Sequence, residues 1–372
     1  MPRPRPLWSR PTRILRGGVG ILFGLLAACS LTDPFHTDFD AIEPAVMYQA
    51  AHLTPAAAPT DSLLVMTYNI KFGSARVRFF FECEGTRGVM SDDEVIGNLA
   101  GLAGKINQVQ PDVLLLQEVD VGSKRTAYVD QVQWLLDHTH LNYGAYASQW
   151  RADFVPTDGV GRVDSGNAVL SRWPIHEAER LALAQSRANS AVVNYFYLKR
   201  NILRGHLSVG EHDLWFLAMH AEAFSDDDIR KEHIAMFSQL LTELDAEGAH
   251  VVAGGDFNTI PPGSKRLSGF PDDCADGRYD NDDYAGEEHY LDTLYAGFSE
   301  AISLPAYQAD NTPYFSFTGD AASGWNRRLD YLFTNGSFVV GSGLVHQDLT
   351  QGGYDTLPLS DHAPVSAQWV LP

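Results

Sequence analysis

Short apolar runs recur along the chain, and between some of them the apolar residues are spaced every three or four positions. Buried strands give the first pattern and amphipathic helices give the second. The runs that predict strands lie at residues 63–68, 113–116, 166–171, 175–183, 192–199, 214–219, 251–253, 328–333, 338–345 and 363–370. Many strands interleaved with a few helices indicate one α/β domain over residues 61–372.

Helical spacing is clearest in three places. The apolar residues between positions 95 and 109 follow the stretch from Ser91 to Glu94, which has the spacing of a capping box, and Pro111 ends that predicted helix. A second helix is predicted over residues 127–137. A third is predicted over residues 229–244, after a capping sequence that begins at Ser225.

The first 28 residues have the composition of an export signal. Five arginines and no acid occupy residues 1–16, and an apolar run follows from Gly17 to Ala28. This order is typical of a signal peptide. The run of roughly 12 residues is too short for a membrane span, which needs about 20. Leu26-Ala27-Ala28-Cys29 resembles the lipobox of bacterial lipoproteins, which implies cleavage before Cys29 and lipidation of its thiol.

The N-terminal features predict an exported lipoprotein of the bacterial cell envelope, which faces the periplasm or the cell surface and is held at the membrane by Cys29. Residues 29–60 are rich in Ala, Pro and Asp and predict a flexible tether. Removal of residues 1–28 leaves 22 basic against 47 acidic residues, and the formal charge changes from −20 to −25. A surface with this much negative charge argues against tight, non-specific nucleic-acid binding, so nucleic acid would bind only as a substrate. We expect a monomer.

Two cysteines remain once Cys29 is set aside. An oxidising compartment allows Cys83 and Cys274 to pair, and we predict a disulfide between them. The alternative is two separate thiols.

Four predicted strands end in polar side chains. Asn69, Glu118 and His220 follow three of them, and the run at 251–253 leads through two glycines to Asp256 and Asn258. A side chain at the end of a buried strand is rigidly held and can still open into a cleft. A single Gly-Asp-x-Asn sequence is most simply a turn, but polar residues at four strand ends favour a functional site.

Two later segments add further candidates. Asp330 lies inside an otherwise apolar strand, where an acid is costly unless it is paired. Asp361 and His362 stand side by side just before the last strand. His362 is the natural partner of Asp330, because a carboxylate orients an imidazole and stabilises its charged form.

The candidate residues offer oxygen ligands, few histidines and no cysteine. Carboxylate and amide oxygens suit Mg²⁺ or Mn²⁺, and also Ca²⁺, better than Zn²⁺. Two histidines can stabilise charge on a phosphoryl group while an aspartate positions or deprotonates a water. Hydrolysis of a phosphoester requires these parts.

Six short motifs, taken together and in order, resemble the endonuclease/exonuclease/phosphatase superfamily, the group of deoxyribonuclease I, neutral sphingomyelinases and inositol polyphosphate 5-phosphatases. They are Thr67-Tyr68-Asn69-Ile70, Leu116-Gln117-Glu118-Val119, Ala218-Met219-His220, Gly255-Asp256-Phe257-Asn258, Leu329-Asp330-Tyr331 and Ser360-Asp361-His362. They extend over nearly all of residues 61–372. The resemblance implies a four-layer α/β sandwich, with two packed mixed sheets flanked by helices and the site at one end.

The resemblance also implies a role for each residue. Glu118 would be the principal metal ligand, assisted by Asn69 and Asp361. Asp256 would orient or deprotonate the attacking water, and Asn258 would hold the phosphoryl group. His220 and His362 would stabilise the phosphate charge, with Asp330 supporting His362. The alternative for each residue is an ordinary structural role in a turn, a strand end, a buried histidine or an ion pair.

Differences in sequence from two groups of the superfamily argue against assigning this chain to either of them. Abasic-site endonucleases of the superfamily carry an acid where this chain has Lys71, and they lack a histidine like His220. The 5-phosphatases have Pro-x-Trp-Cys-Asp-Arg around the penultimate acid, which here lies in the stretch from Arg327 to Tyr331. Insertions at residues 76–90 and 261–289 follow strands that end in candidate site residues, and we expect both at the rim of the active-site cleft. The apolar stretch at residues 79–81 is either core or a loop that touches lipid.

The prediction is therefore an exported, Mg²⁺-dependent phosphoester hydrolase, most simply a phosphodiesterase that uses in-line attack by water. Phospholipid headgroups and sugar or inositol phosphates are alternative substrates. A non-catalytic surface binding protein on the same fold is an alternative of another class.

Overall fold

The computed structural model describes residues 33–57, 59, 61–223, 227–275, 282–348 and 355–372. The predicted signal peptide, Cys29 and the predicted cap at Ser225 lie outside these residues. Residues 276–281 of the second insertion also lie outside them.

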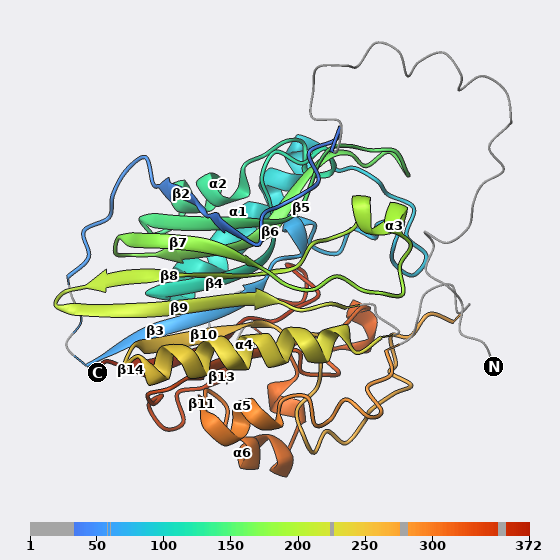
Figure 1. The fold of residues 1–372 in the computed structure, drawn as a ribbon. Helices are drawn as coiled ribbons and strands as arrows, with labels where there is room; N and C mark the ends of the chain where they lie inside the picture. The colour runs from blue at the N-terminus through green and yellow to red at the C-terminus, as the bar shows by residue number, and fades with distance from the viewer. Residues whose placement is uncertain (1–32, 58, 60, 224–226, 276–281, 349–354) are drawn as a thin grey trace, which may run out of the picture.

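Two seven-stranded mixed sheets form the centre of the domain (Figure 1). Sheet A has the order β1-β7-β8-β9-β10-β12-β11, and sheet B has the order β13-β14-β3-β4-β6-β5-β2. The strands of sheet A are β1 (Ile42–Pro44), β7 (Ile175–Ala182), β8 (Asn201–Val209), β9 (His212–His220), β10 (His250–Asp256), β11 (Ser299–Glu300) and β12 (Asp330–Thr334). The strands of sheet B are β2 (Val46–Gln49), β3 (Ser62–Asn69), β4 (Val113–Asp120), β5 (Tyr143–Val155), β6 (Gly161–Ser171), β13 (Leu344–Val345) and β14 (Val365–Val370).

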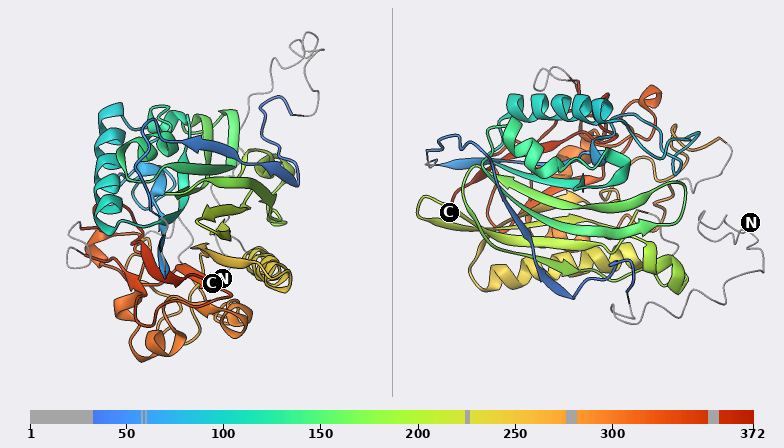
Figure 2. Two further views of the ribbon diagram at one scale, coloured as in Figure 1. Left: turned by 90° about the vertical axis from the view of Figure 1, so that its left-hand side faces the viewer. Right: turned by 90° about the horizontal axis from the view of Figure 1, so that it is seen from above.

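Helices cover the outer faces of both sheets. The long helices α1 and α4 lie on opposite sides of the sheet pair (Figure 2). Apolar residues of α1 and α2 pack on sheet B, and those of α4 and α5 pack on sheet A. The helices are α1 (Asp92–Val109), α2 (Gln131–His138), α3 (Ala191–Phe196), α4 (Ile229–Ala246), α5 (Asp292–Gly297) and α6 (Leu304–Ala309). The predicted four-layer sandwich is confirmed.

The continuous apolar run of β4 is explained by burial on both faces. Val113 and Leu115 point between the sheets, whereas Leu114 and Leu116 pack against α1 and α2. All four side chains are fully buried. A strand covered on both faces needs no polar alternation, and each such side chain contributes about 1.5–3 kcal/mol of burial.

The boundaries of α1 follow the sequence prediction. The Ser91 side chain accepts a hydrogen bond from the Glu94 backbone N–H, and the Glu94 side chain accepts one from the Ser91 backbone N–H. This reciprocal pair satisfies two of the unpaired donors at the helix start. Gln110 closes the helix in the left-handed conformation, with φ 57°, directly before Pro111.

Two predicted strands are wrong. Residues 192–199 contain the helix α3, whose start is capped by the Ser190 side chain accepting from the Val193 N–H. None of the α3 residues is buried. The valines and aromatic residues of this segment, which favour strands, are therefore not explained by a place in a sheet. Of residues 338–345, only β13 pairs as a strand, together with an isolated bridge from Phe338 to Trp369.

Strands β5 and β8 were not predicted. In β8 the residues at 204, 206 and 208 are polar and alternate with buried ones, but Gly205 interrupts the pattern. A Cβ at Gly205 would lie 2.7 Å from the Phe216 ring, so this glycine makes room for a neighbouring strand.

Part of the predicted tether belongs to the folded domain. Strand β1 pairs antiparallel with β7 at the edge of sheet A, and β2 pairs antiparallel with β5 at the edge of sheet B. The segment from Ile42 to Gln49 therefore runs from one sheet to the other. No helix among the described residues is long and apolar enough to cross a membrane.

Candidate active site

The predicted site residues gather at one end of the two sheets. In sheet A, Asp256 ends β10 and stands in register with His220 at the end of β9 and with Asp330 at the start of β12. In sheet B, Asn69 ends β3 beside the adjacent β4, which carries Glu118. The site therefore lies across the two sheets.

Asp256 is the centre of this group. Its Oδ2 accepts a hydrogen bond from the Asn69 side-chain amide at 3.0 Å, and it lies 3.4 Å from His220 Nε2 and 3.5 Å from His362 Nε2. Its Oδ1 accepts from the Asn258 backbone N–H at 2.9 Å. Burial raises the pKa of Asp256 to about 7, against the opposing charge of His362. A carboxyl group with a pKa in this range is suited to accept a proton near neutral pH.

Asp330, His362 and Ser316 form a buried hydrogen-bonded chain. His362 Nδ1 lies 2.8 Å from Asp330 Oδ2, which also accepts from the Ser316 hydroxyl at 2.6 Å. Burial alone would lower the pKa of His362, but the carboxylates of Asp330 and Asp256 raise it to about 10. The ring is therefore an imidazolium at neutral pH, held with Nε2 toward Asp256.

His220 has the opposite protonation state. Burial, together with the charges of Arg200 and His362, lowers its pKa well below the ordinary value. Its Nδ1 faces the Gln149 side-chain amide at 3.4 Å. A neutral ring whose Nδ1 accepts from Gln149 presents a proton on Nε2, toward Asp256.

Glu118 is turned toward the site by a local departure from strand geometry. The pairing of β4 with β6 shifts register between Leu116 and Val119, as in a β-bulge, and Glu118 has φ 55°. Positive φ is uncommon for a non-glycine residue and clusters at functional sites. Its Oε1 accepts from the Asn69 amide at 3.2 Å. Burial raises the pKa of Glu118, and the charge of Asp361 adds to this effect.

The two glycines before Asp256 are required by close packing. A Cβ at Gly254 would lie 2.3 Å from the Tyr331 carbonyl oxygen, and one at Gly255 would lie 1.9 Å from that of Met219. Gly255 also has φ 139°. Only glycine therefore fits between β9 and β12 at these positions, which brings Asp256 beside its two neighbours.

Asp361 and Asn258 flank the central group. The Asp361 carboxylate accepts from the Ser360 hydroxyl and lies 3.7 Å from the Lys71 ammonium. Burial would raise the pKa of Asp361, but the charges of Lys71 and His362 lower it. The Asn258 side chain donates to the Ala221 carbonyl at 3.1 Å, and its backbone is left-handed with φ 48°.

Arg200 is a candidate that the sequence analysis missed. It is 4% exposed, and its Nε and Nη1 have no hydrogen-bond partner among the described residues. The nearest carboxylate, Glu222, lies 3.7 Å away. A buried guanidinium with free N–H groups near His220 is suited to bind a phosphate oxygen. The sequence feature that could have indicated Arg200 is its position directly before β8. The apolar pattern did not predict that strand.

Two groups of side chains are able to hold a cation. The ligand atoms of Asp256, Asp330 and His362 lie within 4.8 Å of one another. However, the charged His362 ring is hydrogen-bonded to Asp330 and offers no unprotonated nitrogen to a cation. The Glu118 side chain is 29% exposed, accepts from the Asn69 amide and lies 3.9 Å from His220 Nε2. It forms no ion pair with a lysine or arginine among the described residues, and a carboxylate placed in this way fits a divalent cation. The Asn69 amide group points its nitrogen at both carboxylates, while its oxygen accepts from the Lys71 N–H.

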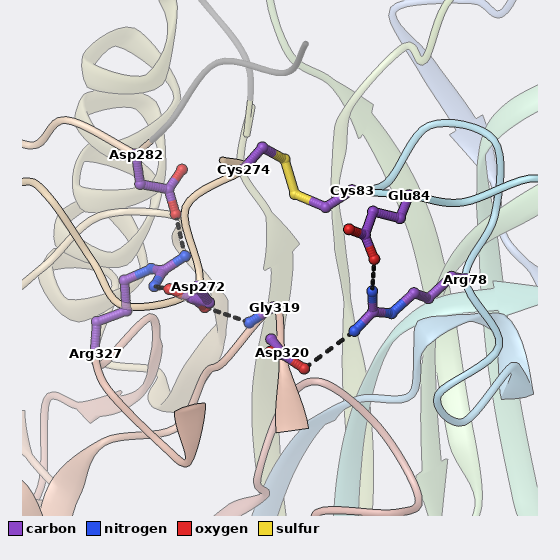
Figure 3. Close-up of a disulfide and its surroundings, with 9 residues drawn as sticks. All are labelled: Arg78, Cys83, Glu84, Asp272, Cys274, Asp282, Gly319, Asp320 and Arg327. Atoms are coloured by element: carbon purple, nitrogen blue, oxygen red, sulfur yellow. Dashed lines mark hydrogen bonds and ion pairs between the residues drawn. A yellow bond between two sulfur atoms is a disulfide. The ribbon is translucent and has the colours of Figure 1, made fainter. Parts of the chain in front are cut away.

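The two insertions are joined by a disulfide (Figure 3). Cys83 of the first insertion is bonded to Cys274 of the second, 191 residues later, so the predicted pairing is confirmed. On one side of it, Arg78 binds Glu84 and Asp320 at 3.1 Å each. On the other side, the buried Arg327 binds Asp272 and Asp282 of the second insertion.

The first insertion is also tied to the site through Lys71, whose ammonium pairs with Glu82 at 2.5 Å and lies near Asp361. Phe79 is fully buried and packs edge-on against Phe72 with ring centroids 4.9 Å apart. The core interpretation of residues 79–81 is therefore confirmed for Phe79, while Phe80 and Phe81 are half-buried.

Loss of this disulfide is expected to destabilise the protein. Because the bond closes a loop of 191 residues, replacing both cysteines (Cys83→Ser with Cys274→Ser) should lower the free energy of unfolding by about 2–5 kcal/mol. Urea unfolding of parent and variant, each with and without reductant, measures the difference. Reductant should weaken the parent and leave the variant unchanged. Identical curves for all four samples would show that the bond contributes nothing.

No curated protein sequence matches this chain. An endonuclease/exonuclease/phosphatase from Beutenbergia cavernae DSM 12333 has a similar structure, with TM-score 0.53 and 19% identity over 84% of this chain and 72% of that one. The catalytic domain of human nocturnin, solved with a bound sulfate anion, has TM-score 0.50 and 16% identity over 88% of this chain and 98% of that one. These two structures share the fold.

A sequence profile described as the Endonuclease/Exonuclease/phosphatase family matches residues 66–362. This match includes every strand end that carries a site residue. The chain therefore belongs to the endonuclease/exonuclease/phosphatase family.

Proposed function

We propose that this protein is an exported, divalent-metal-dependent phosphodiesterase. The observation that carries the proposal is the arrangement around Asp256, where a buried carboxyl group is met by the side chains of Asn69, His220 and His362 within 3.5 Å. Attack of water on a phosphodiester requires a group that accepts the proton of the water and hydrogen-bond donors that stabilise the phosphoryl oxygens. The carboxyl group and its three neighbours can supply both.

In this mechanism water attacks phosphorus, one P–O ester bond breaks, and a proton of the water ends on the leaving oxygen. Asp256 orients the water and takes its proton. The charged His362, fixed by Asp330, stabilises the negative charge that develops on the phosphoryl oxygens. His220 donates from Nε2 to the same group. The Arg200 guanidinium, which lies 3.7 Å from the Glu222 carboxylate, adds a further positive charge nearby. Asn258 helps to hold the phosphoryl group.

Glu118 is the proposed principal ligand of Mg²⁺ or Mn²⁺, with Ca²⁺ as a further candidate, and Asn69 and Asp361 assist it. A cation bound there would supply positive charge to the phosphate oxygens and to the leaving group. The Glu118 carboxylate supports this assignment, because it is partly exposed and forms no ion pair with a lysine or arginine among the described residues. A charged His362 offers no nitrogen to a cation, which argues for Glu118 over the group of Asp256, Asp330 and His362.

Export and lipidation at Cys29 belong to the same proposal. The disulfide between Cys83 and Cys274 supports export, because such bonds persist in oxidising compartments. The lipobox-like sequence before Cys29 supports a lipid anchor.

The test of this function uses the full chain with Mg²⁺ and compares bis(p-nitrophenyl) phosphate with p-nitrophenyl phosphate. We expect faster cleavage of the diester, and EDTA should abolish it. Glu118→Gln should weaken Mg²⁺ binding by at least about 100-fold in calorimetry, because the carboxylate charge is lost. Glu84→Gln is the matched control, since that glutamate is 80% exposed at the rim.

Cleavage that survives EDTA would exclude metal dependence. Absence of turnover on any phosphoester, with Mg²⁺ measurably bound, would instead favour a binding protein on this fold.

A further inference from the structure

The N-terminal segment of the described chain is fastened to α3. The Tyr195 hydroxyl donates to Asp33 Oδ1 at 2.6 Å, and the Phe35 backbone N–H donates to the same hydroxyl at 3.2 Å. The Lys199 ammonium donates to the Thr37 carbonyl at 2.7 Å. Residues 33–37 thus sit against the segment from 195 to 199 before the chain enters β1.

That segment lies at the catalytic end of the molecule. The Tyr197 hydroxyl donates at 3.0 Å to Glu222, two residues after His220. The Lys199 backbone N–H donates to the carbonyl of Gln149, the residue whose amide faces His220. Figure 1 shows α3 on the same side as the C-terminal ends of β3 and β9, with the C-terminus at the opposite end.

The same place carries an apolar surface, here called the aromatic patch and made of Phe35, Phe154, Val192, Tyr195 and Phe196. The Phe35 ring lies 5.6 Å from that of Phe196 and 6.5 Å from those of Phe154 and Tyr195. Val192 is 72% exposed and Phe154 is 51% exposed. These side chains come from three separate segments, so the patch is a product of the fold.

The distance from Cys29 to this patch is limited by covalent geometry. Four peptide units join Cys29 to Asp33, and they span at most about 14 Å when extended. A compact domain of this size is about 50 Å across. If the anchor is at Cys29, it therefore holds the catalytic end near the bilayer and the opposite end far from it.

We propose that the aromatic patch rests on the phospholipid bilayer that holds the lipidated Cys29, and that the substrate is the phosphodiester of a lipid headgroup at that surface. This inference rests on the proposed function and on the proposed lipidation. Aromatic side chains favour the membrane–water interface, and a single lipid chain binds stably when a second contact assists it.

The charges around the patch favour an uncharged surface. Asp153 pairs with His36 at 2.6 Å and lies 3.6 Å from Arg162, and Asp38 lies 3.3 Å from Lys199. Asp38 and Asp153 each have a basic neighbour, Asp33 is bonded to the Tyr195 hydroxyl, and the patch itself offers apolar contact rather than a basic surface. Zwitterionic lipids are therefore the expected partner.

The first experiment measures membrane depth with a nitroxide label on the full, lipid-anchored chain in vesicles of phosphatidylcholine and sphingomyelin. The label is placed at Val192→Cys, at Phe154→Cys, or at Val340→Cys as control. Val340 is 99% exposed and lies beyond β12, whose Thr334 pairs near the start of β10 at the opposite end. Labels at 192 and 154 should be more accessible to oxygen than to a water-soluble nickel chelate, and the label at 340 should show the reverse. Equal water exposure at 192 and 340 would overturn the docking, as would a mature protein without acyl chains on Cys29.

The second experiment separates docking from catalysis. Val192→Glu should lower headgroup release from the vesicles by about tenfold, because a charge at the interface opposes docking, while cleavage of soluble bis(p-nitrophenyl) phosphate is unchanged. Val340→Glu should change neither rate. Unchanged headgroup release in Val192→Glu would overturn the proposal, and so would cleavage of the soluble diester without any cleavage of lipid. Failure on both substrates would refute the proposed function, while the depth measurement would still decide the docking.

Discussion

Asp256→Asn is expected to lower kcat on a phosphodiester by about 10³-fold or more and to leave the fold intact. Asparagine keeps the size of the side chain and an oxygen for the Asn258 backbone N–H, which now binds Asp256 Oδ1. It loses the ability to accept a proton from the attacking water, and a positioned general base contributes about 10²–10⁴-fold. The Asp256 carboxylate also organises three neighbouring donors, so the decrease in kcat on its loss should lie in the upper part of that range.

Steady-state kinetics and thermal unfolding of the purified variant test this result. Asp213→Asn is the matched control, because Asp213 is 66% exposed and its ion pair within the described part of the chain is with His206. Parental kcat in a folded Asp256→Asn variant would remove Asp256 from the mechanism.

His362→Asn should lower kcat by about 10²–10³-fold, the range seen when one stabilising donor of the transition state is lost. The asparagine amide can still donate to Asp330 Oδ2, where His362 Nδ1 now lies at 2.8 Å, so the buried carboxylate keeps a partner. What disappears is the positive Nε2 group that faces Asp256. A variant that is folded and retains the parental kcat would contradict this role.

The pH dependence checks the same residue by another route. The pKa of His362, about 10, lies above its ordinary value of 6.5. Its charged form therefore stabilises the fold fully below pH 6.5, and this contribution is lost as the pH rises through 10. Because Asp330 supplies the largest raising charge, Asp330→Asn should move the alkaline limb of the kcat/KM profile to lower pH. A limb at the same pH in both proteins would show that another group controls it.

The parts of the structure that could be predicted are those in which a buried strand runs directly into a polar residue. Each such run fixes where its strand ends, and parallel neighbours place those ends together, so the sequence alone predicted that Asn69, Glu118, His220 and Asp256 gather at one end of the sheets. The Asp330–His362 pair followed from the cost of an unpaired acid in an apolar strand. These inferences depend on local sequence and on the general geometry of sheets.

The parts that escaped prediction depend on contacts between distant segments. Helix α3 is held by its cap at Ser190 and by residues 33–37, and its own composition resembles a strand. The turn of Glu118 into the site depends on a register shift against β6. Arg200 is informative only because its guanidinium is buried near His220, with Nε and Nη1 lacking a hydrogen bond among the described residues, and no spacing in the sequence reveals that.

The path of β1 and β2 has a consequence for the solubility of the domain. Each strand occupies the outer edge of a different sheet, next to β7 and next to β5. An open edge presents unpaired N–H and C=O groups to any passing strand and is a common starting point for aggregation. The edge strands themselves are short, with three residues in β1 and four in β2, and Pro44 in β1 has no N–H to donate. Short edges of this kind offer little template to a neighbouring molecule, which would matter most for copies concentrated at a membrane by the proposed anchor.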